Sequence, residues 1–218
     1  MGGVLPRERK STAVRREEIA SAAMRIIGER GLPALSTSAL AAEVGVSTGA
    51  LFRHFASQDD ILRHAALNAV AILESTFPEP SLPAVERLLA LARNRVQAFT
   101  GNPGLAWFLR SDQAELVLPP DASASLHDLV ARSKRFVLDA LRQGVREGTV
   151  RDDVEPEVLQ VLVLATIHSL VGRSAFQSRT SRVTTRPEQV LQGLGRLLAP
   201  SATSRTALKH AEKPARRR

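Results

Sequence analysis

Two incompatible folds can be read from one stretch of the chain, Val44-Gly45-Val46-Ser47-Thr48-Gly49-Ala50-Leu51-Phe52-Arg53-His54-Phe55. Within it, residues 45–49 spell G-x-S-x-G, the nucleophile elbow of a serine hydrolase, which requires a strand before the serine and a helix after it. The same residues also fit a tight turn followed by a short helix that carries small polar side chains. Residues 38–43, just upstream, contain no β-branched side chain and favour a helix. The context therefore rejects the hydrolase elbow.

The composition is that of an ordinary globular chain. Of the 218 residues, 44% are hydrophobic and 24% are charged, and none is cysteine, which excludes disulfides and thiolate metal sites. No apolar run approaches the ~18 residues of a membrane span, and the polar N-terminus lacks the apolar segment of a secretory signal. We therefore expect a cytoplasmic protein. Because H-E-x-x-H, P-loop and G-x-G-x-x-G motifs are absent, we expect no enzyme, no bound metal and no cofactor.

The positive charge lies at the two ends of the chain. The whole chain carries a formal +8, of which residues 1–16 contribute +4 and residues 199–218 contribute +5, leaving −1 for residues 17–198. Such tails are usually solvated and only sometimes bind polyanions. We predict a basic N-terminal arm over residues 1–14 and a disordered basic tail over residues 200–218.

Apolar residues recur with a helical period along the chain, and no convincing strand-type alternation appears. Residues 158–171 are apolar nearly all round, so they must bury more than one face. The sequence predicts an all-α chain of about nine helices. They cover or begin at residues 19–27, 37–44 (capped by Ser36), 48, 57, 83, 104–116, 126–145, 156 and 187–198.

The helix-turn-helix reading accounts for each part of the quoted stretch. Gly45 suits the turn because glycine tolerates a positive φ, and the Ser47 hydroxyl can cap the second helix. The inward-facing residues are Val44, Val46, Leu51 and Phe55, and the outward-facing ones are Thr48, Gly49, Ala50 and Arg53. In such a pair the second helix contacts base edges in the DNA major groove through its N-terminal residues.

This region resembles the N-terminal domain of the TetR-type (TetR/AcrR) bacterial transcriptional regulators. The turn, core and helix caps fall in register over residues 15–62, through Arg16-Glu17-Glu18-Ile19, Glu29-Arg30-Gly31, Leu40-Ala41, Gly45-Val46-Ser47, Gly49, Leu51, His54-Phe55 and Ile61-Leu62. The resemblance implies a three-helix helix-turn-helix domain over residues 15–60 and a C-terminal helical ligand-binding and dimerisation domain over residues 61–199. It also implies a repressor that binds a palindromic operator in double-stranded DNA as a homodimer and is released by a small-molecule effector. The alternative is a helical nucleic-acid-binding protein without an effector.

The resemblance also indicates which residues contact DNA. They are Arg15, Ser36, Ser38, Ser47, Thr48, Gly49, Ala50, Phe52, Arg53 and His54. The family commonly has a phosphate-binding tyrosine at the position of Phe52, a lysine at Gln58 and a cation at Thr48. His54 and Arg53 remain as phosphate anchors, with backbone N–H groups at helix starts. We infer that the basic arm supplies part of the missing attraction.

The C-terminal part holds a few aromatic and polar side chains that could contact an effector. They are Trp107, Phe108, Gln113, Phe136, Thr166 and His168, with Arg110, Asp112 and Phe176 as further candidates. Each also has an ordinary structural interpretation. The aromatic side chains fit a core, Arg110 and Asp112 fit a solvated surface pair, and His168 fits a buried histidine or a dimer contact.

The last two helices favour self-association. Residues 158–171 are too apolar for one buried face, and Leu191, Leu194 and Leu198 form a stripe that could complement them. A two-fold interface of four helices would bury both and would set two recognition helices about one DNA turn (~34–36 Å) apart. The alternative is that residues 158–171 form the central core of a monomer.

Overall fold

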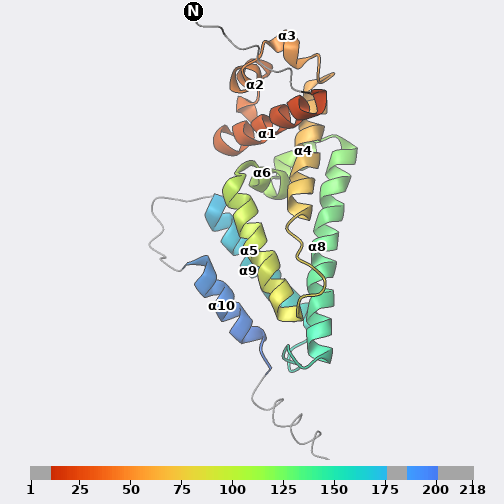
Figure 1. The fold of residues 1–218 in the computed structure, drawn as a ribbon, viewed down its shortest axis with the longest axis vertical. Coiled ribbons are helices and arrows are strands. Elements are labelled where there is room, and N and C mark those ends of the chain that lie inside the picture. The colour runs from red at the N-terminus through yellow and green to blue at the C-terminus, as the bar shows by residue number, and fades with distance from the viewer. Residues whose placement is uncertain (1–10, 176–185, 201–218) are drawn as a thin grey trace, which may run out of the picture. The chain divides into compact units, whose positions relative to one another are not determined.

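The computed structural model describes residues 11–175 and 186–200, and these residues form helices without a strand (Figure 1). This confirms the all-α prediction. Ten α-helices and one short 3₁₀-helix follow one another: α1 Thr12–Arg30, η1 Leu32–Ala34, α2 Thr37–Val44, α3 Thr48–Leu51, α4 Gln58–Glu74, α5 Ala84–Gly101, α6 Gly104–Arg110, α7 Asp112–Val117, α8 Pro120–Arg146, α9 Pro156–Ala175 and α10 Pro187–Leu198.

Two helix boundaries differ from the sequence prediction. Residues 104–116 were predicted as one helical piece, but Ser111 separates α6 from α7 and caps α7 by accepting a hydrogen bond from the backbone N–H of Gln113 at 3.2 Å. This break gives ten α-helices in the described residues instead of about nine. At the N-terminus, α1 already begins at Thr12 because the Ser11 hydroxyl caps it. Residues 12–14 of the predicted arm are therefore helical, whereas residues 1–10, and 201–218 of the predicted tail, lie outside the described residues.

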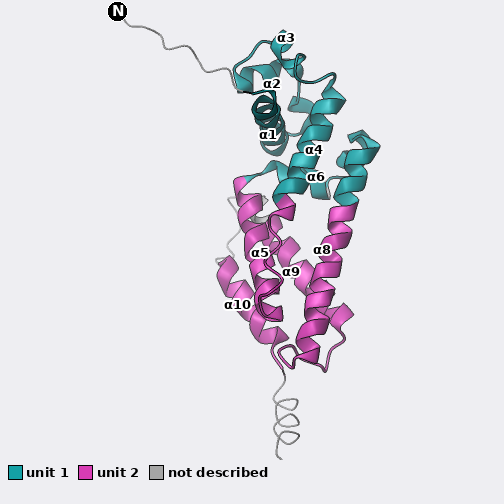
Figure 2. Ribbon diagram, turned by 45° about the vertical axis from the view of Figure 1, so that its right-hand side comes forward, with its two compact units in different colours: residues 1–72, 102–127 teal, residues 73–101, 128–218 magenta. Residues whose placement is uncertain are grey.

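The chain divides into two compact units, residues 1–72 with 102–127, and residues 73–101 with 128–218 (Figure 2). The predicted helix-turn-helix region, residues 15–60, belongs wholly to the first unit, which also takes in α6, α7 and the start of α8. Helices α4 and α8 each contribute residues to both units.

In the first unit, α1 packs closely against α6 through two glycines. A Cβ atom added to Gly28 would lie 2.6 Å from the carbonyl carbon of Pro103, and one added to Gly104 would lie 2.8 Å from that of Met24. Neither separation is possible for real atoms, so only glycine permits this approach. Around it, α1 buries an apolar face whose members are Ile19, Ala20, Ala22, Ala23, Met24, Ile26 and Ile27.

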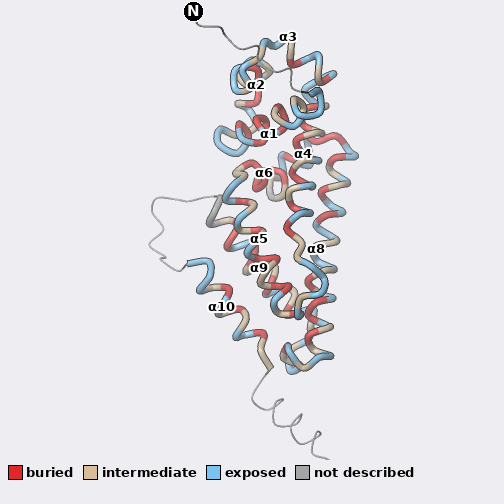
Figure 3. Tube along the Cα trace, in the orientation of Figure 1, coloured by how far each residue is buried: buried red, intermediate tan, exposed pale blue. Residues whose placement is uncertain are grey.

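In the second unit, α10 lies against α5 and α9. Buried and exposed residues alternate along α10 in the helical rhythm that its sequence predicts (Figure 3). Its buried residues are Leu191, Leu194 and Leu198, so the assignment of this stripe to an intermolecular surface was wrong: the stripe is covered by the chain's own helices. The end of α10 is also held by the backbone N–H of Arg151, which donates to the Leu198 carbonyl at 2.9 Å.

Helix α9 is buried on one face and exposed on another. Leu159, Val163 and Ile167 belong to the core, whereas three other large apolar side chains remain more than half exposed within the chain: Val158 at 52%, Val161 at 64% and Leu162 at 54%. One face of α9 therefore has no apolar cover from the described part of its own chain.

Within residues 11–175 and 186–200, no helix is long and apolar enough to cross a membrane. The same residues contain no cluster of three or more His, Cys, Asp or Glu side chains that could hold a metal ion.

Candidate nucleic-acid interface

The turn between α2 and α3 has the geometry that the quoted stretch predicts. Ser36 caps α2 by accepting a hydrogen bond from the Ala39 N–H at 3.1 Å, and Ser47 caps α3 by accepting one from the Ala50 N–H at 3.1 Å. Between the two helices, Gly45 adopts the left-handed conformation, with φ 71° and ψ 41°. Both caps and the glycine turn are confirmed.

The side chains that follow the turn divide by polarity and exposure. Leu51 and Phe55 are fully buried, and the two valines that flank Gly45 are half-buried. The exposed residues are Thr48, Gly49, Phe52 and Arg53, and Ala50 and His54 are half-buried. The short helix α3 is therefore fixed by its apolar side and offers small, polar and basic groups to solvent.

The other predicted DNA contacts already have partners within the domain. Arg15 donates to the Glu18 carboxylate at 2.9 Å through one of its five N–H groups. The Ser38 hydroxyl lies 3.0 Å from the hydroxyl of Ser36. The hydroxyls of Ser36 and Ser47 cap their helices. Both residues therefore have a structural role that does not depend on DNA.

Helix α4 begins with the capping arrangement that residues 57–60 predict. The Ser57 hydroxyl accepts from the Asp60 N–H at 3.1 Å, and the Asp60 carboxylate accepts in return from the Ala56 N–H at 3.3 Å. Next to the cap, the Gln58 side chain donates to the Leu35 carbonyl at 3.1 Å. The residue that stands where the family often has a lysine therefore ties α4 to the segment before α2.

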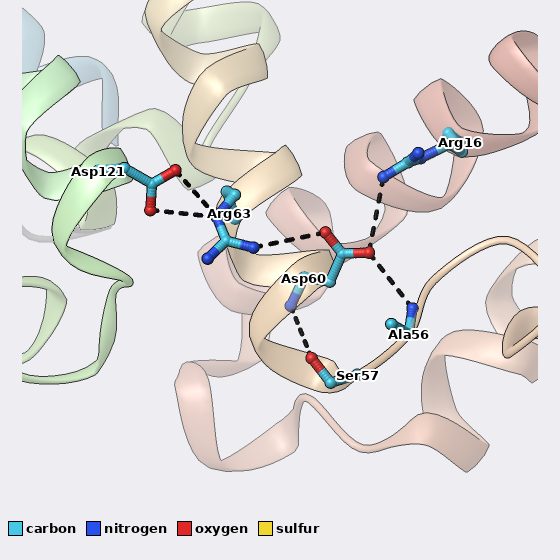
Figure 4. A network of polar contacts seen from close by, with 6 residues as sticks. All are labelled: Arg16, Ala56, Ser57, Asp60, Arg63 and Asp121. Atoms are coloured by element: carbon cyan, nitrogen blue, oxygen red, sulfur yellow. Dashed lines mark hydrogen bonds and ion pairs between the residues drawn. The ribbon is translucent and has the colours of Figure 1, made fainter.

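A polar network that the sequence did not predict joins α1, α4 and the start of α8 within the first unit (Figure 4). Asp60 lies 3.6 Å from both Arg16 and Arg63, and Arg63 donates to both carboxylate oxygens of Asp121 at 3.1 and 3.0 Å. The hydrogen bond from Arg63 lowers the pKa of Asp121. Arg16 also lies over the Phe55 ring, 4.8 Å from its centroid. Only Asp60 could be found from a local signal, because Arg63 and Asp121 are 58 residues apart.

The predicted effector contacts fall into both units. In the first unit, Trp107 packs edge-on against the buried Phe108 with 5.0 Å between ring centroids, whereas Gln113 is exposed. In the second, Phe136 packs against Phe77 at 5.2 Å. Among the remaining candidates, the Thr166 hydroxyl donates to the Leu162 carbonyl at 2.8 Å, and His168 and Asp112 are exposed. Phe176 and the Arg110 side chain lie outside the described part of the chain.

Two capped helices joined by a left-handed glycine turn, with polar groups exposed on the second, define the helix-turn-helix class of DNA-binding proteins. A family model describing bacterial regulatory proteins of the tetR family matches residues 19–65. The match covers the helix-turn-helix region, so this domain of the chain is similar to those of the TetR family of bacterial regulatory proteins.

Relatives and solved structures extend the similarity beyond the matched region. The HTH-type transcriptional repressor Rv1474c of Mycobacterium tuberculosis is 26% identical over 163 residues, which cover 75% of this chain and 83% of that protein. The ketosteroid transcriptional regulator KstR2 of Mycobacterium tuberculosis has a TM-score of 0.68 at 20% identity, covering 86% of this chain and 96% of that one. AibR, solved in complex with isovaleryl coenzyme A and operator DNA, has a TM-score of 0.67 at 20% identity, covering 85% and 98%. At these identities the structures show a shared fold.

Proposed function

We propose that this chain is a transcriptional repressor that acts in the cytoplasm, binds a palindromic operator in double-stranded DNA as a homodimer, and releases it when a small molecule binds. The observation that carries the proposal is α3, which Ser47 caps and whose exposed residues are Thr48 and Gly49, followed by Arg53. The second helix of such a pair reads base edges with its first residues. The repressor Rv1474c and the complex of AibR with operator DNA and isovaleryl coenzyme A support the same function.

We assign the candidate contacts to two roles. Thr48, Gly49 and Ala50 are placed to read base edges, because a small side chain lets the helix backbone approach the groove. Arg53 and His54 are placed to contact phosphates, which fix the register without carrying sequence information. Phe52 is exposed but lacks the hydroxyl that would bind a phosphate, so more of the attraction falls to the basic arm.

The exposed face of α9 supports dimerisation. Val158, Val161 and Leu162 form an apolar surface that a second copy of the chain would cover by two-fold symmetry. On α10, Leu197 is the exposed large apolar residue, at 66%. We therefore propose that α10 contributes Leu197 to the interface, because its three other leucines named above are buried within the chain.

Effector binding would act by shifting an equilibrium. A small molecule changes DNA affinity only through its difference in affinity for two arrangements of the protein. Helices α4 and α8 contribute residues to both compact units, and they are the elements through which we propose that the effector acts.

Selection from a pool of randomised DNA duplexes at physiological salt tests the proposal. Wild type should enrich a palindromic sequence, and Thr48→Asp should lose it, because the new carboxylate faces the DNA. Ala124→Asp is the control: Ala124 is also exposed and near the start of its helix, but it lies on α8, outside both the turn and the basic arm. Weak binding without sequence preference, unaffected by Thr48→Asp, would contradict operator recognition by α3.

A further inference from the structure

Helix α5 carries two arginines that are buried in the second unit. Arg87 is 9% exposed and Arg95 is 8% exposed. Arginine is rarely buried unless it is paired, since an uncompensated charge in the protein interior is costly. Three less buried arginines of this unit differ from them, because each lies against a carboxylate: Arg93 against Glu188, Arg142 against Glu157 and Arg151 against Asp153.

The first buried arginine reaches a carboxylate through one intermediate. Arg87 donates to the amide oxygen of Gln143 at 2.6 Å, and the amide nitrogen of Gln143 donates to the Glu147 carboxylate at 2.6 Å. The positive charge of Arg87 is therefore linked to a negative one through an oriented amide.

The second buried arginine has only neutral partners among the described residues. Arg95 donates to the Ser133 hydroxyl at 3.0 Å, and its guanidinium lies over the Phe77 ring, 5.3 Å from the centroid. The Ser133 hydroxyl in turn donates to the Leu129 carbonyl at 2.8 Å, so this chain of hydrogen bonds ends on a neutral group. The Nε atom of Arg95 is buried without a hydrogen-bond partner in the described part of the chain.

The charge of Arg95 persists despite its burial. Burial lowers the pKa of Arg95 to about 10, which still leaves the guanidinium protonated at neutral pH. A folded protein that keeps a buried cation without a counter-ion carries a cost in stability that a bound anion would offset.

We propose that Arg95, together with Ser133, Phe77 and Phe136, binds the carboxylate of a small organic acid that has an apolar body. This identifies the chemical class of the effector and rests on the ligand-responsive function proposed above. The planar guanidinium matches two carboxylate oxygens, and its single charge matches a monoanion. Phe77 and Phe136 pack edge to face and are both half-buried, so they offer apolar surface beside the charge and reach the outside of the unit.

Thermal unfolding and calorimetry of the full chain with butanoate, octanoate and dodecanoate test this site. At least one of these carboxylates should raise the melting temperature of wild type and bind measurably, and octanol, which has the same chain without the charge, should not. In Arg95→Gln the Kd for the carboxylate should rise about tenfold or more, because a charge-assisted pair is lost. The matched control is Arg93→Gln, two residues away on α5, which removes an exposed ion pair and should leave carboxylate binding unchanged.

Arg95→Lys covers the case in which Arg95→Gln does not fold. Lysine keeps the positive charge but cannot donate the two parallel hydrogen bonds of a guanidinium. The variant should therefore bind the carboxylate more weakly than wild type does, and should still bind octanoate in preference to octanol. Three results would overturn the proposal: no carboxylate binds wild type, octanol binds as well as octanoate, or Arg95→Gln binds octanoate like wild type. Binding of octanoyl coenzyme A without any binding of octanoate would also overturn it, since the thioester has no carboxylate.

The same reagents separate this proposal from the repressor function. If octanoate binds through Arg95 but does not release the selected operator, the carboxylate site stands and ligand-controlled repression fails. If another class of compound releases the operator and no carboxylate binds, repression stands and the carboxylate site fails.

Discussion

Two exposed surfaces of this chain differ in kind: the turn around α3 and the outer face of α9. Around α3 the exposed residues are small, polar or basic except for Phe52, and the apolar Leu51 is buried behind them. On α9 the exposed large apolar side chains are two valines and a leucine, each more than half exposed. The polar groups of the first surface are well hydrated, whereas the apolar groups of the second favour burial against another apolar surface.

The difference predicts different physical behaviour. The proposed DNA binding at α3 would depend on hydrogen bonds and on the release of counter-ions from phosphates, so it should weaken steeply with salt. The proposed association through α9 would depend on apolar burial, so it should depend little on salt. A substitution at one surface should therefore leave binding at the other surface unchanged.

The largest effect is expected at α9. Val161→Asp places a charge in the proposed apolar interface, and we expect dimerisation to weaken about 100-fold or more. Analytical ultracentrifugation at micromolar concentration measures this. Val130→Asp is the control, because Val130 is an exposed apolar residue on α8 that lies outside the proposed surface. If the wild-type protein sediments as a monomer, the exposed face of α9 is not a dimer interface, and the proposal of self-association is wrong.

The second effect concerns salt. Deleting residues 1–10 removes three basic side chains and one acid but keeps Ser11, the cap of α1. Each lost phosphate contact should reduce the slope of log K against log salt by ~0.9, measured by operator titration at several salt concentrations. The dimerisation constant of the same deletion should not change. An unaltered slope would mean that the arm makes no phosphate contact and that α3 and its neighbours supply all of them.

A smaller effect separates folding from recognition within the turn itself. Gly45→Ala should lower the free energy of unfolding by about 1 kcal/mol, because alanine is strained at φ 71° even though nothing lies within 4 Å of the new Cβ. Gly49→Ala, which also has open space but an ordinary helical φ, should not destabilise the fold. Operator affinity should show the opposite order, with Gly49→Ala the more harmful. Urea unfolding and operator titration of both variants would show whether the two glycines differ in this way.

The smallest effect tests the exposed polar contacts of the first unit. Because Arg63 lowers the pKa of Asp121 below its ordinary value of 3.8, the pair adds stability above that pH and loses it as the pH falls through the lowered value. Asp121→Asn should therefore reduce the melting temperature slightly at pH 7 and not at all in strong acid. A large reduction at pH 7 would mean that polar contacts on this unit contribute more than exposed ion pairs normally do.

What the sequence predicted well is local. The caps at Ser36 and Ser47 and the turn at Gly45 are each determined by residues within four positions of one another. Hydrogen-bond capping and left-handed glycine geometry depend on such short spacings, so they can be read before any tertiary structure is known.

What the sequence missed depends on distant partners. The leucine stripe of α10 was correctly identified as apolar, but a stripe does not say whether its cover comes from the same chain or from another. Arg95 gave no signal at all, since an arginine within a helix is ordinarily exposed and its burial depends on Phe77 and Ser133 from other segments. The predicted effector contacts belong to both compact units and stay a prediction.

The glycine contact between α1 and α6 bears on how such a regulator can be recombined. Gly104 belongs to a segment that follows α4 in the chain, yet it closes against α1 next to Gly28 and counts with residues 1–72 as one compact unit. A chimera joined at residue 72 would transplant the helices that we propose read the operator, but not the segment that packs against α1. A donor fragment must therefore also carry residues 102–127. Otherwise the recipient protein must have a glycine at the position that corresponds to Gly104. The exchangeable unit of this chain therefore consists of two separate stretches of sequence that pack together, and one junction cannot isolate it.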